Sequence, residues 1–212
     1  MNQRRSNPKI VDIINHSFYA DRLKAVNNKY NPIVARPPYS ECVIGMSCVE
    51  DGAVRFTKGG TRQNTANAEA VINIVDQYSK DEEATFSIGI ITPYTGQVSL
   101  LKARFIERAY SLDFQDRVKI GTVHTFQGSE CDVIIFDMVD CLKFEKGKNV
   151  YPGKIYAGEQ GEQLLNVAIS RARHKLIVVC DPEYLVTPPG GKLSEKSISI
   201  FNTLLKARWT KM

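Results

Sequence analysis

The segment TFQGSE (residues 125–130) places a hydroxyl, an amide, a glycine and a carboxylate within six positions. Gly128 would let a ligand approach the backbone closely. Gln127 could orient a water or a phosphate, and Glu130 could accept hydrogen bonds from ribose hydroxyls. The same residues are typical of a tight turn between two strands. The segment alone favours this simple turn over a ligand site.

A second polar segment, LLNVAISRARHK (residues 164–175), ends in the cations Arg171, Arg173 and Lys175. Guanidinium groups bind phosphates through paired hydrogen bonds. Basic residues at the end of a helix can also serve only to stabilise the helix dipole. Both interpretations stay open on spacing alone.

Apolar runs alternate with helical patterns along the chain and predict the elements that position these residues. Val- and Ile-rich runs indicate buried strands, whereas apolar residues at helical spacing indicate amphipathic helices. We expect strands at residues 42–49, 86–92, 118–124, 132–140 and 175–181. We expect helices at residues 8–23, 65–78 and 162–172, and another after residue 92. The pattern predicts an α/β fold, with a parallel sheet covered by helices on both faces.

Ligands of such sheets bind at the carboxyl ends of the strands, so the polar residues there are candidates. Thr92 and Tyr94 follow one apolar run, and Thr122 and His124 end another. We expect the arginines of the second segment at the same edge. His124 also fits a buried, hydrogen-bonded histidine.

Length and breaks in the pattern predict one domain that spans residues 1–212. Glycine, lysine and tyrosine dominate residues 141–161, where we expect a loop excursion before the next helix. An amphipathic stretch near 194–209 predicts a closing helix.

Composition excludes several classes of protein. The net charge is +5, which permits a polyanionic partner without requiring one. The five cysteines have no CxxC spacing, so we expect no zinc or other metal site, no disulfide framework and a reducing compartment. We expect no membrane span and no signal peptide. The sequence contains no GxxxxGK[ST], and hence no phosphate-binding P-loop.

Four segments together resemble the C-terminal motifs of superfamily 1 helicases. They resemble in particular the group of the nonsense-mediated-decay RNA helicase, the Dna-two nuclease-helicase and the nidovirus helicases. The resemblance covers residues 3–181, nearly the whole chain. The segments are QRRSNPKIVDIINHSFYADRL, IGIITPYTGQVSLL, VKIGTVHTFQGSECDVIIFD and LLNVAISRARHKLIVVCD.

The resemblance implies a second RecA-like domain, a P-loop-NTPase-type sheet that lacks the P-loop itself. In such helicases two RecA-like domains close around ATP, and the N-terminal one holds the P-loop lysine and most Mg²⁺ contacts. The resemblance implies catalytic roles near the terminal phosphate for Arg5, Gln127 and the arginine finger Arg171. It implies nucleotide contacts for Gln3, Gly128, Glu130 and Arg173, although Arg173 also fits a structural or interdomain ion pair.

The resemblance also implies that Thr92, Tyr94, Thr122 and His124 contact the backbone of a single-stranded nucleic acid. Arg55, Lys58 and Arg62 could add to that surface, or could form a solvated charged face. The family's Q-Y-R-M-H-P block reads QRRSNP here, so Arg4 stands in place of an aromatic residue that packs near adenine. The sequence does not separate DNA from RNA.

These observations predict the C-terminal motor domain of an ATP-dependent helicase of the cytoplasm or nucleus. We expect its partners to be a single-stranded nucleic acid and the N-terminal RecA-like domain of the same protein. We expect the chain alone to turn over no ATP. The alternative is a non-catalytic nucleic-acid-binding or interaction module that keeps the fold. A stand-alone α/β enzyme is disfavoured, because the three histidines have no obvious nucleophile partner.

Overall fold

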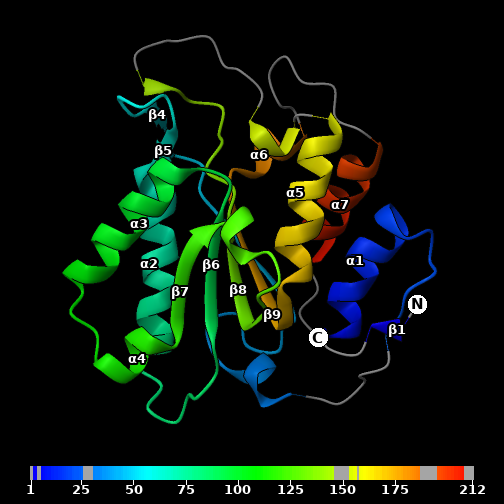
Figure 1. Cartoon of the computed structure of the whole chain (residues 1–212), viewed down its shortest axis with the longest axis horizontal. Helices are drawn as coiled ribbons and strands as arrows, with labels where there is room; N and C mark the ends of the chain where they lie inside the picture. Colours follow the sequence, from blue (N-terminus) through cyan, green and yellow to red (C-terminus); the bar gives the residue numbers. More distant parts are fainter. Residues whose placement is uncertain are drawn as a thin grey trace.

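A five-stranded parallel sheet forms the centre of the molecule, with strand order β3-β9-β8-β6-β7 (Figure 1). The computed structural model describes residues 2–3, 6–25, 31–145, 153–156, 158–186 and 195–207. The strands are β3 (Ile44–Cys48), β6 (Ile88–Thr92), β7 (Val118–Thr122), β8 (Cys131–Asp137) and β9 (Ala172–Cys180). This architecture confirms the predicted α/β class.

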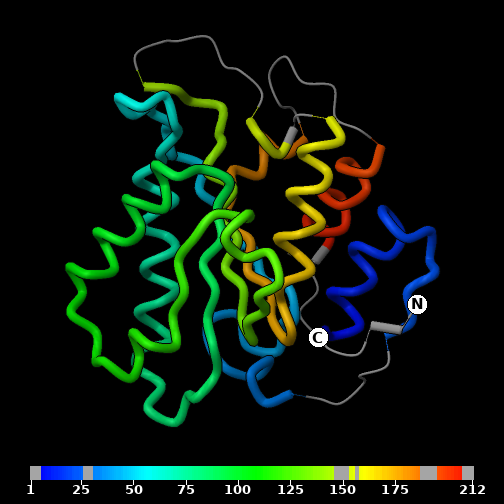
Figure 2. Tube along the Cα trace, viewed as in Figure 1, coloured from blue at the N-terminus to red at the C-terminus, as the bar shows by residue number. Residues whose placement is uncertain are grey.

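Helices cover both faces of the sheet, which explains why its strands are apolar on both sides. One face carries α1 (Pro8–Phe18), α5 (Gly158–Ser170) and α7 (Glu195–Ala207). The other face carries α2 (Thr65–Ser79), α3 (Thr95–Glu107) and α4 (Leu112–Asp116). Figure 2 shows that the first and last helices, blue and red, lie side by side although the whole sheet separates them in sequence.

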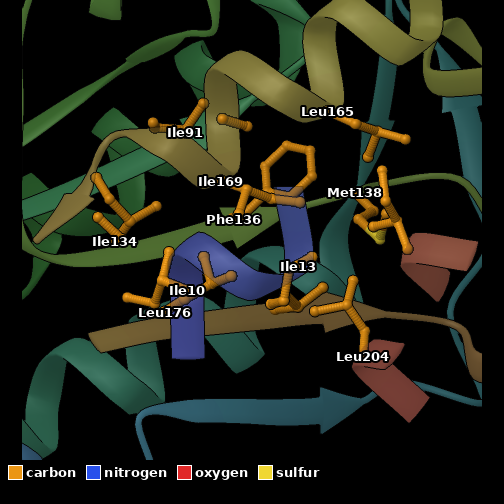
Figure 3. Close-up of a cluster of buried hydrophobic side chains, with 14 of the residues drawn as sticks. Ile10, Ile13, Ile91, Ile134, Phe136, Met138, Leu165, Ile169, Leu176 and Leu204 are labelled. Atoms are coloured by element: carbon orange, nitrogen blue, oxygen red, sulfur yellow. The ribbon is translucent and has the colours of Figure 1, made fainter. Parts of the chain in front are cut away.

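Successive side chains of β8 enter different cores, as the period of a strand requires. Ile134 and Phe136 pack with α1 and α5, and Figure 3 shows them among Ile10 and Ile169. Val133 and Ile135 pack in the core beneath α2 and α3. Both faces of the central strand β8 are therefore buried in hydrophobic cores.

Smaller elements complete the described part of the chain. They comprise β1 (Asn2–Gln3), β2 (Lys24–Ala25), the antiparallel pair β4 (Val54–Phe56) and β5 (Arg62–Asn64), α6 (Pro182–Val186), and the 3₁₀ turns η1 (Pro32–Ala35), η2 (His124–Phe126) and η4 (Lys154–Tyr156). The β4–β5 hairpin stands beyond the carboxyl ends of the main strands (Figure 1). The pattern of apolar residues did not predict it, because its strands are short and mostly polar.

Two predicted helix ends differ from the structure. Helix α1 ends at Phe18 instead of residue 23, and the Asn15 amide closes the following turn on the main chain of Leu23 at 2.8 and 3.0 Å. Helix α5 begins at Gly158 and ends at Ser170, and β9 starts two residues later. Arg173 and Lys175 thus belong to a strand and not to the end of a helix.

The predicted excursion at 141–161 lies only in part within the described residues. Phe144 forms a parallel bridge with Val54, and η4 packs against α5. The described helices include none that is long and apolar enough to cross a membrane.

Candidate functional site

Residues from two motif segments meet at the amino ends of β8 and β9. Cys131 lies opposite Ala172 in the parallel register, and the Cys131 amide donates to the Arg171 carbonyl at 3.1 Å. Segments about forty residues apart in sequence are therefore neighbours in space. We call this group the amino-edge cluster; it consists of Gln127, Gly128, Glu130, Arg171 and Arg173.

The position of the cluster corrects one prediction. We expected the arginines at the carboxyl edge of the sheet, but Arg171 immediately precedes β9 and Arg173 is its second residue. The register that joins β8 to β9 places them at the opposite edge, because α5 returns the chain to the start of a parallel strand.

Arg171 is held by neutral groups. Its guanidinium donates to the Val167 carbonyl at 3.2 Å, the Ser129 carbonyl at 3.4 Å and the Ser170 hydroxyl at 3.0 Å. Each of these acceptors carries a partial charge only. Arg171 is partly exposed and forms no ion pair with another residue of the part of the chain that the structure describes.

Arg173 instead faces two carboxylates. Its Nε lies 3.4 Å from Glu130 Oε2, and its Nη1 lies 3.7 Å from Asp132 Oδ1. The ion pair that the sequence left open is thus present in this structure. A role of Arg173 or Glu130 in nucleotide binding stays a prediction.

Gln127 and Gly128 lie on the surface at the end of η2. Gly128 has φ of +79°, in the left-handed region that favours glycine. A Cβ built there would meet no atom within 4 Å. The turn therefore requires glycine for its backbone conformation, and the space beside it is open to a ligand.

A cavity of about 520 Å³ separates η2 from α5. His124 and Gln127 line it from the loop, and Gln163 and Leu164 line it from the helix. His124 is exposed and Thr122 is half-buried, so neither forms part of the core. The structure therefore gives no support to the interpretation of His124 as a buried histidine.

Thr92 and Tyr94 occupy the carboxyl edge as expected, but their side chains point inward. Thr92 is 0% exposed and Tyr94 is 3% exposed. The Tyr94 hydroxyl donates to Asp140 at 2.8 Å and accepts from the Lys154 amide at 2.8 Å. Side chains this buried offer almost no surface to a strand of nucleic acid. Contact with nucleic acid at this turn stays a prediction for its main chain only.

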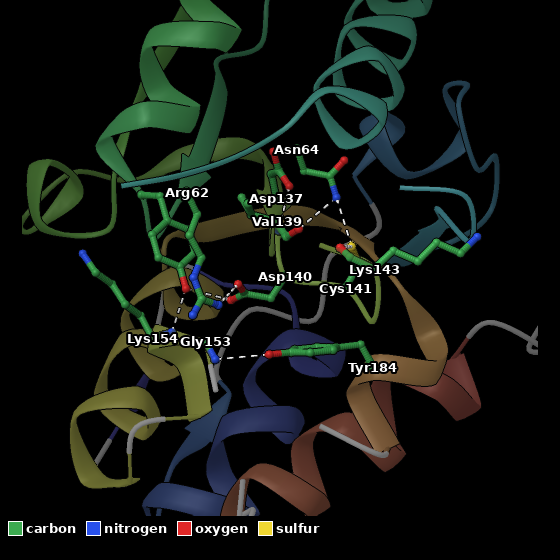
Figure 4. Close-up of polar contacts among 11 residues, drawn as sticks. Arg62, Asn64, Asp137, Val139, Asp140, Cys141, Lys143, Gly153, Lys154 and Tyr184 are labelled. Carbon is green, nitrogen blue, oxygen red and sulfur yellow. Dashed lines mark hydrogen bonds and ion pairs between the residues drawn. The ribbon is translucent and has the colours of Figure 1, made fainter. Parts of the chain in front are cut away.

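The carboxyl edge also contains a buried polar network that the sequence did not predict. Asp137 accepts hydrogen bonds from Asn67 at 2.9 Å and Gln97 at 2.6 Å. Asp140 pairs with Arg62, whose guanidinium also lies 5.6 Å from the Tyr94 ring (Figure 4). Burial raises the pKa of both carboxyl groups to about 6.

Arg62 is therefore part of the interior and does not belong to the basic surface that we considered. It is 7% exposed and stacks 5.5 Å from the Phe56 and Phe144 rings. The sequence carried one usable signal, the two aspartates that end the apolar run DVIIFDMVD. Arg62, the partner of Asp140, lies 78 residues away, where no local pattern could find it.

Lys175 is also buried, so it does not join Arg171 and Arg173 as a third surface cation. Its ammonium is buried and donates to the carbonyls of Val34 at 3.3 Å and Arg36 at 2.8 Å. Burial lowers the pKa of Lys175 to about 8. This lysine anchors η1 to the sheet.

The N-terminal block runs beside the amino-edge cluster. The Asn7 amide donates to the Arg173 carbonyl at 2.7 Å, and the Asn7 side chain caps α1. Arg5 lies outside the described residues. Gln3 belongs to β1, which pairs with β2, and the structure describes only its main chain.

The comparisons with known proteins agree with this fold and these motifs. Residues 1–183 match the family described as "AAA domain". The chain belongs to this AAA domain family. It is 31% identical over 205 residues to the DNA polymerase alpha-associated DNA helicase A of Saccharomyces cerevisiae, covering 86% of this chain and 27% of that protein.

A second relative is the regulator of nonsense transcripts 1 homolog of Arabidopsis thaliana, 25% identical over 199 residues, which cover 88% of this chain and 15% of the relative. The chain thus spans about a quarter or less of these relatives. Their names confirm the predicted group: this is a C-terminal RecA-like domain of the superfamily 1 helicase type.

A solved structure supports the fold. The C-terminal domain of a possible DNA helicase from Lactobacillus plantarum superposes with a TM-score of 0.51 at 16% identity, covering 95% of this chain and 96% of that one. At this identity the likeness concerns the fold alone.

Proposed function

We propose that this AAA-family domain is the C-terminal half of an ATP-dependent helicase motor that moves on single-stranded DNA or RNA. The observation that carries the proposal is the amino-edge cluster. Two motif segments that are separate in sequence bring an exposed amide, an open glycine turn and the Arg171 guanidinium to one corner of the sheet.

The residues of this corner fit a phosphate-bearing ligand. Among the described residues, Arg171 is held by neutral oxygens, which leave its charge available to a ligand. Arg171 would stabilise negative charge on the terminal phosphate of ATP, and Gln127 would orient a water or a phosphate oxygen. Arg5 would join them from the N-terminal block, and Gln3, Gly128, Glu130 and Arg173 would contact the nucleotide.

The remaining parts of the motor would come from a second domain. The bound Mg²⁺–ATP supplies the phosphoryl group, and the N-terminal RecA-like domain of the same protein would hold most of it. Thr122, His124 and the main chain of the turn at Thr92 and Tyr94 would follow the backbone of the single strand. Five cysteines that form no disulfide bond fit the reducing cytoplasm or nucleus.

The test has two parts. The purified 212-residue chain should show no magnesium-dependent ATP turnover, with or without a single strand. In the helicase that carries this domain, Arg171→Ala should lower kcat for ATP by ~10³-fold or more, because an arginine finger acts on the transition state.

Nucleotide affinity provides the control for the second part. Arg171→Ala should change the Kd for ATP far less than it changes kcat. Equal losses in affinity and turnover would contradict the finger role. Robust turnover by the isolated chain would contradict the half-motor proposal.

A further inference from the structure

Two hollows that share one lining residue reach the carboxyl edge of the sheet, and the first also extends along α5 past Gln127 as far as Val167. The first is the cavity between η2 and α5, which Lys154 lines together with His124. The second, of about 420 Å³, lies between the β4–β5 hairpin and η4, and Lys154 lines it together with Phe56. Lys154 therefore lines both hollows.

Lys154 occupies this junction in a defined position. Its amide donates to the Tyr94 hydroxyl at 2.8 Å, and the neighbouring Gly153 amide donates to the Tyr184 hydroxyl at 3.2 Å. Its ammonium lies 5.3 Å from the centre of the Tyr94 ring and 3.3 Å from the Pro93 carbonyl. Figure 4 shows its chain leading away from the buried Arg62–Asp140 pair.

The charge of this surface favours a polyanion over a neutral or basic ligand. Among the described residues that line either hollow, there is no carboxylate. Asp140, the nearest acid in the network, is buried and paired with Arg62. Lys154 is exposed, and within the described residues its ammonium contacts the Pro93 carbonyl and the Tyr94 ring. It is free to bind a phosphate oxygen.

Phe56 adds an aromatic surface to the second hollow. Phe56 is 38% exposed, and the centre of its ring lies 5.5 Å from the Arg62 guanidinium and 6.0 Å from the centre of the Phe144 ring. Gly59 and Gly60 form the hairpin turn beside it and leave the hollow wide. An exposed aromatic ring with fixed supports suits the face of a nucleobase.

We infer that these hollows form one groove for a single-stranded nucleic acid, in which Lys154 binds a backbone phosphate and Phe56 stacks with a base. The inference rests on the proposed function and adds two residues that the motifs do not contain. The groove would extend the surface at His124 across the carboxyl edge toward the hairpin. DNA and RNA both offer backbone phosphates and base faces, so the inference covers single strands of either nucleic acid.

The experiment measures binding of the 212-residue chain to fluorescein-labelled oligouridylate and oligothymidylate by fluorescence anisotropy, over a series of KCl concentrations. Lys154→Ala should weaken binding and lower the slope of log K against log salt by about 0.7, the value for one phosphate contact on a single strand. Lys154→Arg should keep the wild-type slope, because it keeps the charge.

Phe56→Leu tests the stacking contact and keeps an apolar side chain over Arg62. It should weaken binding by about fivefold or more, because base stacking on an aromatic ring is lost. The salt slope should stay at the wild-type value, because no ion is released or gained. The two variants thus have different signatures.

Lys80→Ala is the matched control. Lys80 is exposed like Lys154 but follows α2 at the amino edge of the sheet, so its loss changes net charge equally without touching the groove. Circular dichroism melts of all variants check that the fold is retained.

The outcomes separate this inference from the function on which it rests. A selective loss with either oligonucleotide supports the groove. If wild type binds and Lys154→Ala behaves like Lys80→Ala, the groove is refuted while the motor proposal stands. If wild type binds neither oligonucleotide, the single-strand surface of the proposed function fails and the groove fails with it.

Discussion

Arg171 and Arg173 are two residues apart, yet their partners give them different electrostatic states. Carbonyl and hydroxyl oxygens hold Arg171, whereas Glu130 and Asp132 face Arg173. Dipoles orient a guanidinium without cancelling its charge, but a carboxylate largely neutralises it. Arg171 is therefore the better group to stabilise a phosphate.

Lys175 gives a prediction at the scale of a single residue. Its pKa is about 8 in the folded protein, below the ordinary value of 10.5, because burial disfavours the ammonium. Between these two values the unfolded chain binds the extra proton, so the free energy of unfolding should rise with pH. The gain should approach ~3 kcal/mol at the upper end.

Chemical denaturation of wild type and Lys175→Met between pH ~7 and ~10 measures this effect. The stability difference in favour of wild type should grow as pH rises through about 8. Lys80→Met, which removes an exposed lysine, is the matched control for the loss of one charge. A difference for Lys175→Met that stays constant with pH would mean that the buried amine does not titrate in this range.

At the scale of elements, the parallel register between β8 and β9 creates the amino-edge cluster. Pairing of Cys131 with Ala172 sets the preceding turn beside the end of α5. A shift of one residue would send every side chain of β9 to the opposite face, moving Leu176 and Val178 out of the core beside α1 and α5 and Ile177 into it. The packing of β9 against both cores therefore also positions Arg171.

Helix α7 allows the contribution of one element to be measured. Phe201 is 1% exposed in the core shared with α1, whereas Ile198 on the same helix is 42% exposed. Phe201→Ala should lower the free energy of unfolding by about 3–5 kcal/mol through a cavity and lost burial. Urea denaturation gives the value.

Ile198→Ala is the control within that helix and should change stability by no more than about 0.5 kcal/mol, as expected for a surface position. Similar costs for the two substitutions would show that α7 does not pack on the sheet through the face that contains Phe201.

At the scale of the whole molecule, the candidate residues lie at two edges of one sheet. The amino-edge cluster faces the proposed nucleotide, and His124 and Lys154 lie toward the carboxyl edge. The η2 loop connects them, because it runs from the end of β7 to the start of β8 on the side of α5. Gln127 and His124 belong to this same short loop.

This arrangement predicts that the two functions can be separated by mutation in the helicase that carries the domain. His124→Ala should raise the concentration of single strand needed for half-maximal ATPase stimulation and should leave the maximal rate largely intact. Arg171→Ala should do the reverse, because the proposed arginine finger would act on the phosphoryl transition state. Steady-state ATPase titrations with a single strand measure both quantities. Loss of maximal rate in both variants would mean that the two edges act as one site.

Much of this structure could be predicted from local pattern. Continuous apolar runs and helical stripes depend on neighbouring residues, so the sequence determined the α/β class, the five main strands and α2. It also determined the residue types of the motifs, and hence the family.

The tertiary structure alone decided which of those residues meet and which are exposed. It brought Glu130 to Arg173, buried Tyr94, Arg62 and Lys175, and left Lys154 between two hollows. The physical reason is that burial and charge pairing depend on segments distant in sequence. Asp140 and Arg62 are 78 residues apart, and only the packing of the hairpin over the sheet brings them together.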